Sequence, residues 1–79
     1  MKLRLRYFAS LRDAAGVEFE DIEHAGADAA QLYEAAAARH GFSLPRDRLR
    51  LVVNGQVVAW SQALTDGDEL VFLPPVSGG

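Results

Sequence analysis

Residues 64–79 read LTDGDELVFLPPVSGG, in which a polar turn is followed by an apolar run, two prolines and a pair of glycines. The Asp-Gly pair at 66–67 marks a turn, and residues 69–73 have the apolar character of a strand. The prolines at 74–75 end that strand, because proline has no backbone N–H to donate to a continuing ladder. The sequence therefore predicts a last strand at 69–73 that leads directly into a tail.

The predicted tail, residues 74–79, has features that suit insertion into another protein. The proline rings bias it to an extended conformation, which reduces the conformational freedom that it loses on insertion. Gly78 and Gly79 have no side chains, so even a narrow channel admits them. Fully extended, the segment spans at most about 20 Å. We expect this extended, flexible tail to present its terminal carboxylate for chemistry; an inert, frayed end is the alternative.

The N-terminal residues predict a β-hairpin. Residues 2–8 alternate apolar and basic side chains, which is typical of a strand with one buried face. Residues 10–16 are expected to form a connection, and residues 17–22 a second, partly amphipathic strand. The short spacing favours an antiparallel pair.

One central helix is predicted over residues 29–40, which are rich in strong helix formers. Asp28 and Gln31 have the spacing of a capping box, and Gly41 lies where a left-handed C-terminal cap is expected. A stripe of mostly small side chains would let the helix lie close to a sheet. The expected stripe consists of Leu32, Ala35, Ala36 and Arg39.

A second hairpin is predicted around the Asn-Gly pair at 54–55, a strong signal for a two-residue turn with positive φ. Its strands are residues 49–53 and 56–59. Two hairpins separated by one helix, with the last strand beside the first, give the order of a β-grasp, or ubiquitin-like, fold. We therefore expect one α+β domain, residues 1–79, with a mixed sheet of four to five strands packed on one main helix.

Composition fits a carrier better than an enzyme. A chain of 79 residues has little material for an enclosed catalytic cleft. The net charge of -3 argues against nucleic-acid binding, and no apolar run is long enough to cross a bilayer or to act as a secretory signal. The chain has no cysteine, so any sulfur that it handles must be acquired. The two histidines, His24 and His40, lack the spacing of a metal site.

The last strand, the Pro-Pro pair and the Gly-Gly end, together with the first strand, the helix and the Asn-Gly hairpin, resemble the ubiquitin-like sulfur carriers. The run at 64–79 looks like the end of the small subunits of molybdopterin synthase, the MoaD family. The resemblance covers the whole chain. It implies a cytoplasmic sulfur-donor subunit of a transferase complex, which is not itself catalytic and binds no cofactor.

In this family the terminal glycine carboxylate is adenylated, converted to a thiocarboxylate and inserted into the large subunit, where its sulfur passes to a cyclic pyranopterin precursor of the molybdenum cofactor. The resemblance thus implies that Gly79 carries the reactive group and that Gly78 permits passage of the tail. The implied partners are the large subunit of molybdopterin synthase, an E1-like adenylating enzyme that uses ATP, and a sulfur-donor enzyme.

One face of the last strand is expected to stay exposed. Leu70 and Phe72 oppose Val71 and Leu73, so one of the two pairs remains outside the core. With Phe8 nearby, the outer pair would form an apolar patch that docks the large subunit and the activating enzyme in turn. The expected partner-binding residues are Phe8, Phe72, Leu73, Pro74, Pro75, Val76 and Ser77.

Arginines recur at strand spacing in two places, at Arg4 and Arg6 and again at Arg46, Arg48 and Arg50. If these strands lie close together, the arginines form a basic stripe that suits an acidic partner. A solvated sheet face is the simpler interpretation.

Other functions stay open. The related carriers for thiazole (thiamine) synthesis or tRNA thiolation share the activation chemistry and differ in the sulfur acceptor. A ubiquitin-like protein modifier and a plain interaction domain with an inert tail are further alternatives. The FLPPV sequence at 72–76 favours the molybdopterin branch.

Overall fold

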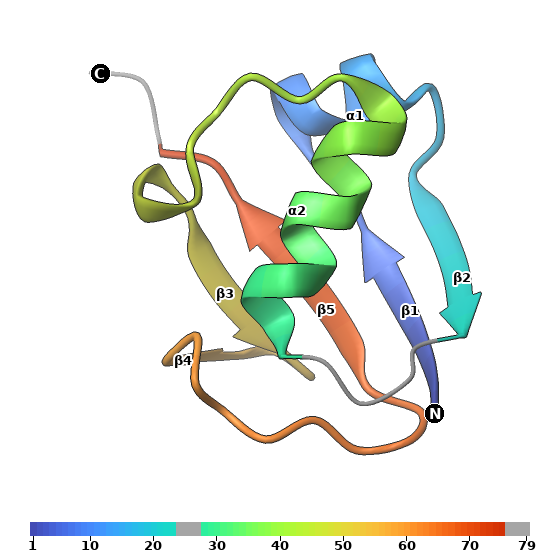
Figure 1. Cartoon of the computed structure of the whole chain (residues 1–79), viewed down its shortest axis with the longest axis vertical. Coiled ribbons are helices and arrows are strands. Elements are labelled where there is room, and N and C mark those ends of the chain that lie inside the picture. Colours follow the sequence, from blue (N-terminus) through green and yellow to red (C-terminus); the bar gives the residue numbers. More distant parts are fainter. Residues whose placement is uncertain (24–27, 76–79) are drawn as a thin grey trace.

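The computed structural model describes residues 1–23 and 28–75, which form a five-stranded sheet with the longer helix lying across one of its faces (Figure 1). The elements, in chain order, are β1 (Lys2–Arg6), α1 (Ala9–Ala15), β2 (Phe19–Glu23), α2 (Ala29–His40), the 3-10 helix η1 (Arg46–Arg48), β3 (Arg50–Val53), β4 (Gln56–Val58) and β5 (Glu69–Leu73).

The strand order across the sheet is β2-β1-β5-β3-β4. β1 pairs with β5 in parallel, whereas the pairs β1–β2, β3–β4 and β3–β5 are antiparallel. The last strand therefore lies in the middle of the sheet and holds the two hairpins together. This mixed α+β arrangement confirms the predicted β-grasp fold. None of the helices in the described part of the chain is long and apolar enough to span a membrane.

The hydrophobic core lies between α2 and the face of the sheet that α2 covers. Strand alternation directs every second side chain of β1, β3 and β5 to this inner face. Phe72 is at its centre, with its ring centroid 5.1 Å from that of Tyr33 and 5.9 Å from that of Trp60. The buried residues of the core from these elements are Leu3, Leu5, Ala29, Leu32, Tyr33, Ala36, Leu51, Val53, Leu70 and Phe72.

Two predictions about helices are corrected. Residues 10–16 are not a simple connection, because most of them belong to α1, which buries Leu11 in the core and ends at Gly16 with φ 76°. This helix is too short to show a clear helical period in the sequence. On α2, Ala35 is exposed and Tyr33 is buried in its place, so the face that contacts the sheet is turned relative to the predicted stripe, and Arg39 is exposed too.

The predicted ends and turns are confirmed where they depend on nearby residues. The backbone N–H of Gln31 donates to Asp28 Oδ1 at 2.9 Å, and Gly41 ends α2 with φ 74°. Asn54 and Gly55 have φ of 50° and 85°, as the tight turn between β3 and β4 requires.

Asp68 fixes the turn that precedes β5. It is only 7% exposed, and its carboxylate accepts hydrogen bonds from the Thr65 backbone N–H and from Asn54 Nδ2, both at 2.8 Å. The hydrogen bond from the Thr65 backbone is the main reason that the pKa of Asp68 is lowered, and the bond from Asn54 adds to it. The start of β5 is thereby tied to the turn of the β3–β4 hairpin.

Candidate functional site

The tail begins at the edge of the sheet where β1 and β5 both end. Because these two strands are parallel, their C-terminal ends lie at the same edge (Figure 1). Leu73 ends β5, Pro74 and Pro75 follow it, and Phe8 follows β1. The structure thus brings Phe8 to the edge from which the tail starts. The predicted site residues Val76, Ser77, Gly78 and Gly79 lie outside the described residues.

The sheet face opposite α2, which we call the outer face, has one residue from each strand aligned across it. The strand registers pair Phe19 with Arg6, Arg6 with Val71, Val71 with Val52, and Val52 with Val57. We call these five residues the outer row. Phe19 and Val57, at its two ends, are 40% and 63% exposed. The outer row is therefore an apolar band with one charged member.

The structure decides which side of β5 enters the core. Leu70 and Phe72 are both 0% exposed on the inner face, while Val71 and Leu73 lie on the outer face. The prediction that Phe72 contacts a partner is wrong, because its ring is enclosed by the core. Leu73 is 37% exposed, but Val71 is only 8% exposed. The exposed apolar surface of this strand is thus narrower than expected.

The guanidinium of Arg6 contacts two aromatic rings on the outer face. Its Cζ is 4.8 Å from the centroid of the Phe8 ring and 5.1 Å from that of the Phe19 ring. Its Nε is buried and has no hydrogen-bond partner among the described residues. Cation–π contacts of this kind hold a guanidinium in place but do not neutralise its charge.

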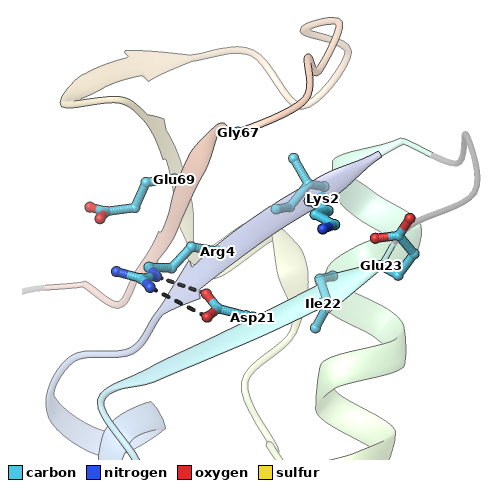
Figure 2. A pocket seen from close by; sticks show the side chains of 8 residues that line it. Lys2, Arg4, Asp21, Ile22, Glu23, Gly67 and Glu69 are labelled. Carbon is cyan, nitrogen blue, oxygen red and sulfur yellow. Dashed lines mark hydrogen bonds and ion pairs between the residues drawn. The ribbon is translucent and has the colours of Figure 1, made fainter.

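Arg4, two positions earlier on the same face of β1, is paired. Its Nε donates to Asp21 Oδ1 at 2.8 Å and its Nη2 to Oδ2 at 3.3 Å. Figure 2 shows this two-pronged contact in the groove formed by β1, β2 and the start of β5, with Glu69 on the side of Arg4 away from Asp21. The hydrogen bond raises the pKa of Arg4 and lowers that of Asp21.

The arginines do not form one basic stripe, because β5 lies between β1 and β3. Arg46 instead lies over the ring of Trp60, with its Cζ 5.3 Å from the ring centroid. Arg48 and Arg50 line a groove at the start of the tail together with Asp47, Leu49, Leu73, Pro74 and Pro75. The simpler interpretation, a solvated sheet face, fits this separation better.

A second charged cluster surrounds Glu20 and joins α2 to β2 and to Tyr7, the residue that follows β1. Glu20 Oε1 accepts hydrogen bonds from Tyr7 Oη at 2.6 Å and Arg39 Nη2 at 2.8 Å, and His40 Nε2 lies 3.1 Å from the same oxygen. Partial burial alone would raise the pKa of Glu20, but the hydrogen bonds from Arg39, Tyr7 and His40 outweigh it and lower that pKa to about 2. Burial, and then the bond to Glu20, raise the pKa of Tyr7 well above its usual value.

The Glu20 cluster is a structural network, since the carboxylate at its centre is already matched by the groups around it. Among the residues described, no group of acidic and histidine side chains is arranged to hold a metal ion. His24, one of the two histidines considered from the sequence, lies outside those residues.

Sequence reasoning missed three members of the outer row, Phe19, Val52 and Val57. The alternation within each strand shows that these residues share a face with their own neighbours. It does not give the registers between strands. The pairing of β1 with β2 places Phe19 opposite Arg6, and the insertion of β5 between β1 and β3 aligns Val52 and Val57 with Val71.

Comparison with known proteins finds a matching family and similar sulfur carrier subunits. The profile of the ThiS family matches residues 5–79. The molybdopterin synthase sulfur carrier subunit of Escherichia coli (strain K12) is 31% identical over 80 residues, covering 98% of this chain and 99% of that protein.

Solved structures of similar proteins share the fold of this chain. The putative molybdopterin converting factor, subunit 1, from Pyrococcus furiosus has a TM-score of 0.78 and 35% identity, covering 96% of this chain and 99% of that one. SAMP1, a small archaeal modifier protein from Haloferax volcanii, has a TM-score of 0.81 and 28% identity, with 100% of both chains covered.

Proposed function

This chain belongs to the ThiS family, and on that premise we propose that it is the sulfur carrier subunit of a molybdopterin synthase. Similarity to the Escherichia coli sulfur carrier subunit over nearly the whole of both chains supports the proposal. The structural observation that carries it is the position of β5. This strand lies at the centre of the outer face and leads into Pro74 and Pro75 at the edge of the sheet. A partner that covers the outer face is thereby in position to receive the tail.

In the proposed reaction the carboxylate of Gly79 attacks the α-phosphate of ATP in an E1-like adenylating enzyme, which forms an acyl adenylate and releases pyrophosphate. This activation is needed because a free carboxylate is anionic and has no good leaving group. Sulfide supplied by a sulfur-donor enzyme then displaces AMP and leaves a thiocarboxylate. In the large subunit that sulfur bonds to the cyclic pyranopterin precursor, which makes a thioester between the tail and the precursor. Water then cleaves the acyl C–S bond, leaves the sulfur on the precursor and restores the carboxylate of Gly79.

The chain's own part is to dock and to deliver. Gly78 has no side chain, which allows the end of the tail to pass through a narrow channel. Phe8 and Leu73 frame the point where the tail starts, and they are the described apolar residues best placed to contact a partner there. The tail residues that follow are proposed to contact the walls of the partner's channel as the tail enters it. They are Pro74, Pro75, Val76 and Ser77.

A ubiquitin-like protein modifier is the second candidate, and the similarity to the archaeal modifier SAMP1 favours it. Isopeptide conjugates that depend on Gly79 would establish this function. The carriers for thiazole synthesis and tRNA thiolation differ from the first candidate in the acceptor alone, so supplying each acceptor in turn separates them.

The test is the intact mass of the chain after incubation with ATP, the adenylating enzyme and a sulfur donor. We expect the increase that corresponds to replacement of one oxygen by sulfur, and we expect the large subunit with pyranopterin precursor to reverse it. Deleting Gly79 should abolish both changes without altering the melting temperature, since the deletion lies beyond the sheet. A chain extended at its N-terminus is the matched control and should behave as wild type. Normal molybdopterin formation by the variant lacking Gly79 would refute the proposal.

A further inference from the structure

We propose that Arg6 is the docking point for a carboxylate that the partner of the outer face carries within an otherwise apolar surface. The inference rests on the proposed function in one respect, namely that a partner protein covers the outer face. It adds the chemistry that this partner must present there.

The position of Arg6 makes its burial unavoidable in such a complex. In the outer row Arg6 lies directly between Phe19 on β2 and Val71 on β5. The ring of Phe8, at the edge where the tail starts, also contacts its guanidinium, with the ring centroid 4.8 Å from Cζ. A protein that covers the apolar outer row and also takes up the tail must therefore cover Arg6.

The charge of Arg6 is not neutralised within the described part of the chain. Among those residues Arg6 has no ion pair, and the carboxylates of Glu20 and Asp21 on the neighbouring strand β2 are already engaged by other side chains. Its Nε is buried without a hydrogen-bond partner. Its Nη atoms are neither buried nor hydrogen-bonded to any described residue, so the end of the guanidinium stays open to an incoming acceptor.

Desolvation then decides what the partner must carry. Removing an unpaired charge from water costs more free energy than the burial of a neighbouring valine returns. With a purely apolar partner, the charge of Arg6 would lose its water without gaining a counter-charge. A carboxylate on the partner would offset that loss by forming a charge-assisted pair with Arg6. The two rings already hold the guanidinium in place, so little side-chain freedom remains to be lost when a carboxylate binds its two Nη groups.

Arg4 provides the internal contrast. It lies on the same strand and the same face, but two of its guanidinium nitrogens, Nε and Nη2, already donate to Asp21 (Figure 2). A partner carboxylate placed at Arg4 would face a pair that is already neutral overall. The charge within the apolar outer row, that of Arg6, thus lacks an ion pair among the described residues, whereas the charge of Arg4 in the groove is paired.

The experiment measures the affinity of the large subunit for wild type, Arg6→Met and the matched control Arg4→Met by calorimetry. Methionine keeps an apolar side chain of similar length in the outer row. If a partner carboxylate faces Arg6, Arg6→Met leaves it buried without a counter-charge, and binding should weaken by roughly 30-fold or more. Arg4→Met should change the affinity by less than about five-fold, because it removes an exposed pair.

A third variant, Arg6→Lys, keeps the charge and should retain more affinity than Arg6→Met. Melting temperatures of all variants establish that each is folded. Unchanged or tighter binding by Arg6→Met would overturn the inference, since it would mean that the partner surface is apolar at this point. The same holds if Arg6→Lys binds as weakly as Arg6→Met. These results leave the proposed function intact, whereas a wild-type chain that neither acquires sulfur nor binds the large subunit overturns both.

Discussion

The inner and outer faces of the sheet use side chains of the same five strands, yet they differ in how far other elements of the chain cover them. On the inner face, α2 closes over Leu70 and Phe72, and both are 0% exposed. On the outer face, the alternate residues of the same strand include Leu73, which is 37% exposed. No described helix or strand lies across the outer row as α2 lies across the inner face (Figure 1).

The charged groups repeat this contrast. The carboxylate of Glu20, beside α2, is surrounded by Tyr7, Arg39 and His40. Arg6, on the outer face, has aromatic rings around it and no ion-pair partner among the described residues. The difference teaches that the fold surrounds Glu20 with its own hydrogen-bond donors but leaves Arg6 without an ion pair among the described residues.

Substitutions at neighbouring residues of β5 should give the largest difference in stability between the two faces. Phe72→Ala should lower the free energy of unfolding by about 3–5 kcal/mol, because it leaves a cavity beside Tyr33 and Trp60. Leu73→Ala, one position along on the outer face, should cost less than about 1 kcal/mol. Urea denaturation of both variants measures the difference. Similar losses at the two positions would mean that the outer face contributes to stability as the inner face does.

Removing the charge of Glu20 should have the next largest effect. Glu20→Gln should lower the free energy of unfolding at pH 7 by about 1–3 kcal/mol, because Arg39 and Tyr7 lose a charged acceptor. The pKa of Glu20 is about 2 in the folded chain against an ordinary 4.5, so the folded state binds this proton less readily than the unfolded state. The contribution of Glu20 is therefore complete above pH 4.5 and is lost as the pH falls toward 2.

Denaturation of wild type and Glu20→Gln across this pH range checks the sign. The gap in stability between the two proteins should close as the solution becomes more acidic. A gap that stays constant would show that the ionised carboxylate is not what the cluster depends on. Glu18→Gln is the control, since Glu18 lies 3.9 Å from Arg12 in an exposed pair and should change stability little.

The smallest effect is expected at the cap of the helix that covers the inner face. Asp28→Ala removes the acceptor for the Gln31 backbone N–H and should cost about 1 kcal/mol. Asp13→Ala, at an exposed position within α1, should change the free energy of unfolding by less than about 0.5 kcal/mol. Thermal denaturation compares the two. Equal effects would show that the cap does not help to hold α2 over the sheet.

Much of the fold was predictable because its signals are local. The bounds of β5, the limits of α2 and the turn at Asn54 each depend on residues a few positions apart, and all three are confirmed. α1 was missed since two turns of helix show too little periodicity, although Gly16 marked its end. The partner-facing role given to Phe72 was wrong because alternation separates the two sides of a strand without telling which one is buried.

By itself, the sequence determined the strands, the longer helix, the turns and the order that leads β5 into the Pro74-Pro75 pair, since neighbouring residues set the backbone preferences that build them. Only the tertiary structure decided which faces are covered and which charges are paired. The parallel pairing of β1 with β5 sets Arg6 beside Val71, and the pairing of β1 with β2 gives Asp21 to Arg4. Burial and pairing are properties of residues that meet across strands, so a pattern read along one strand does not contain them.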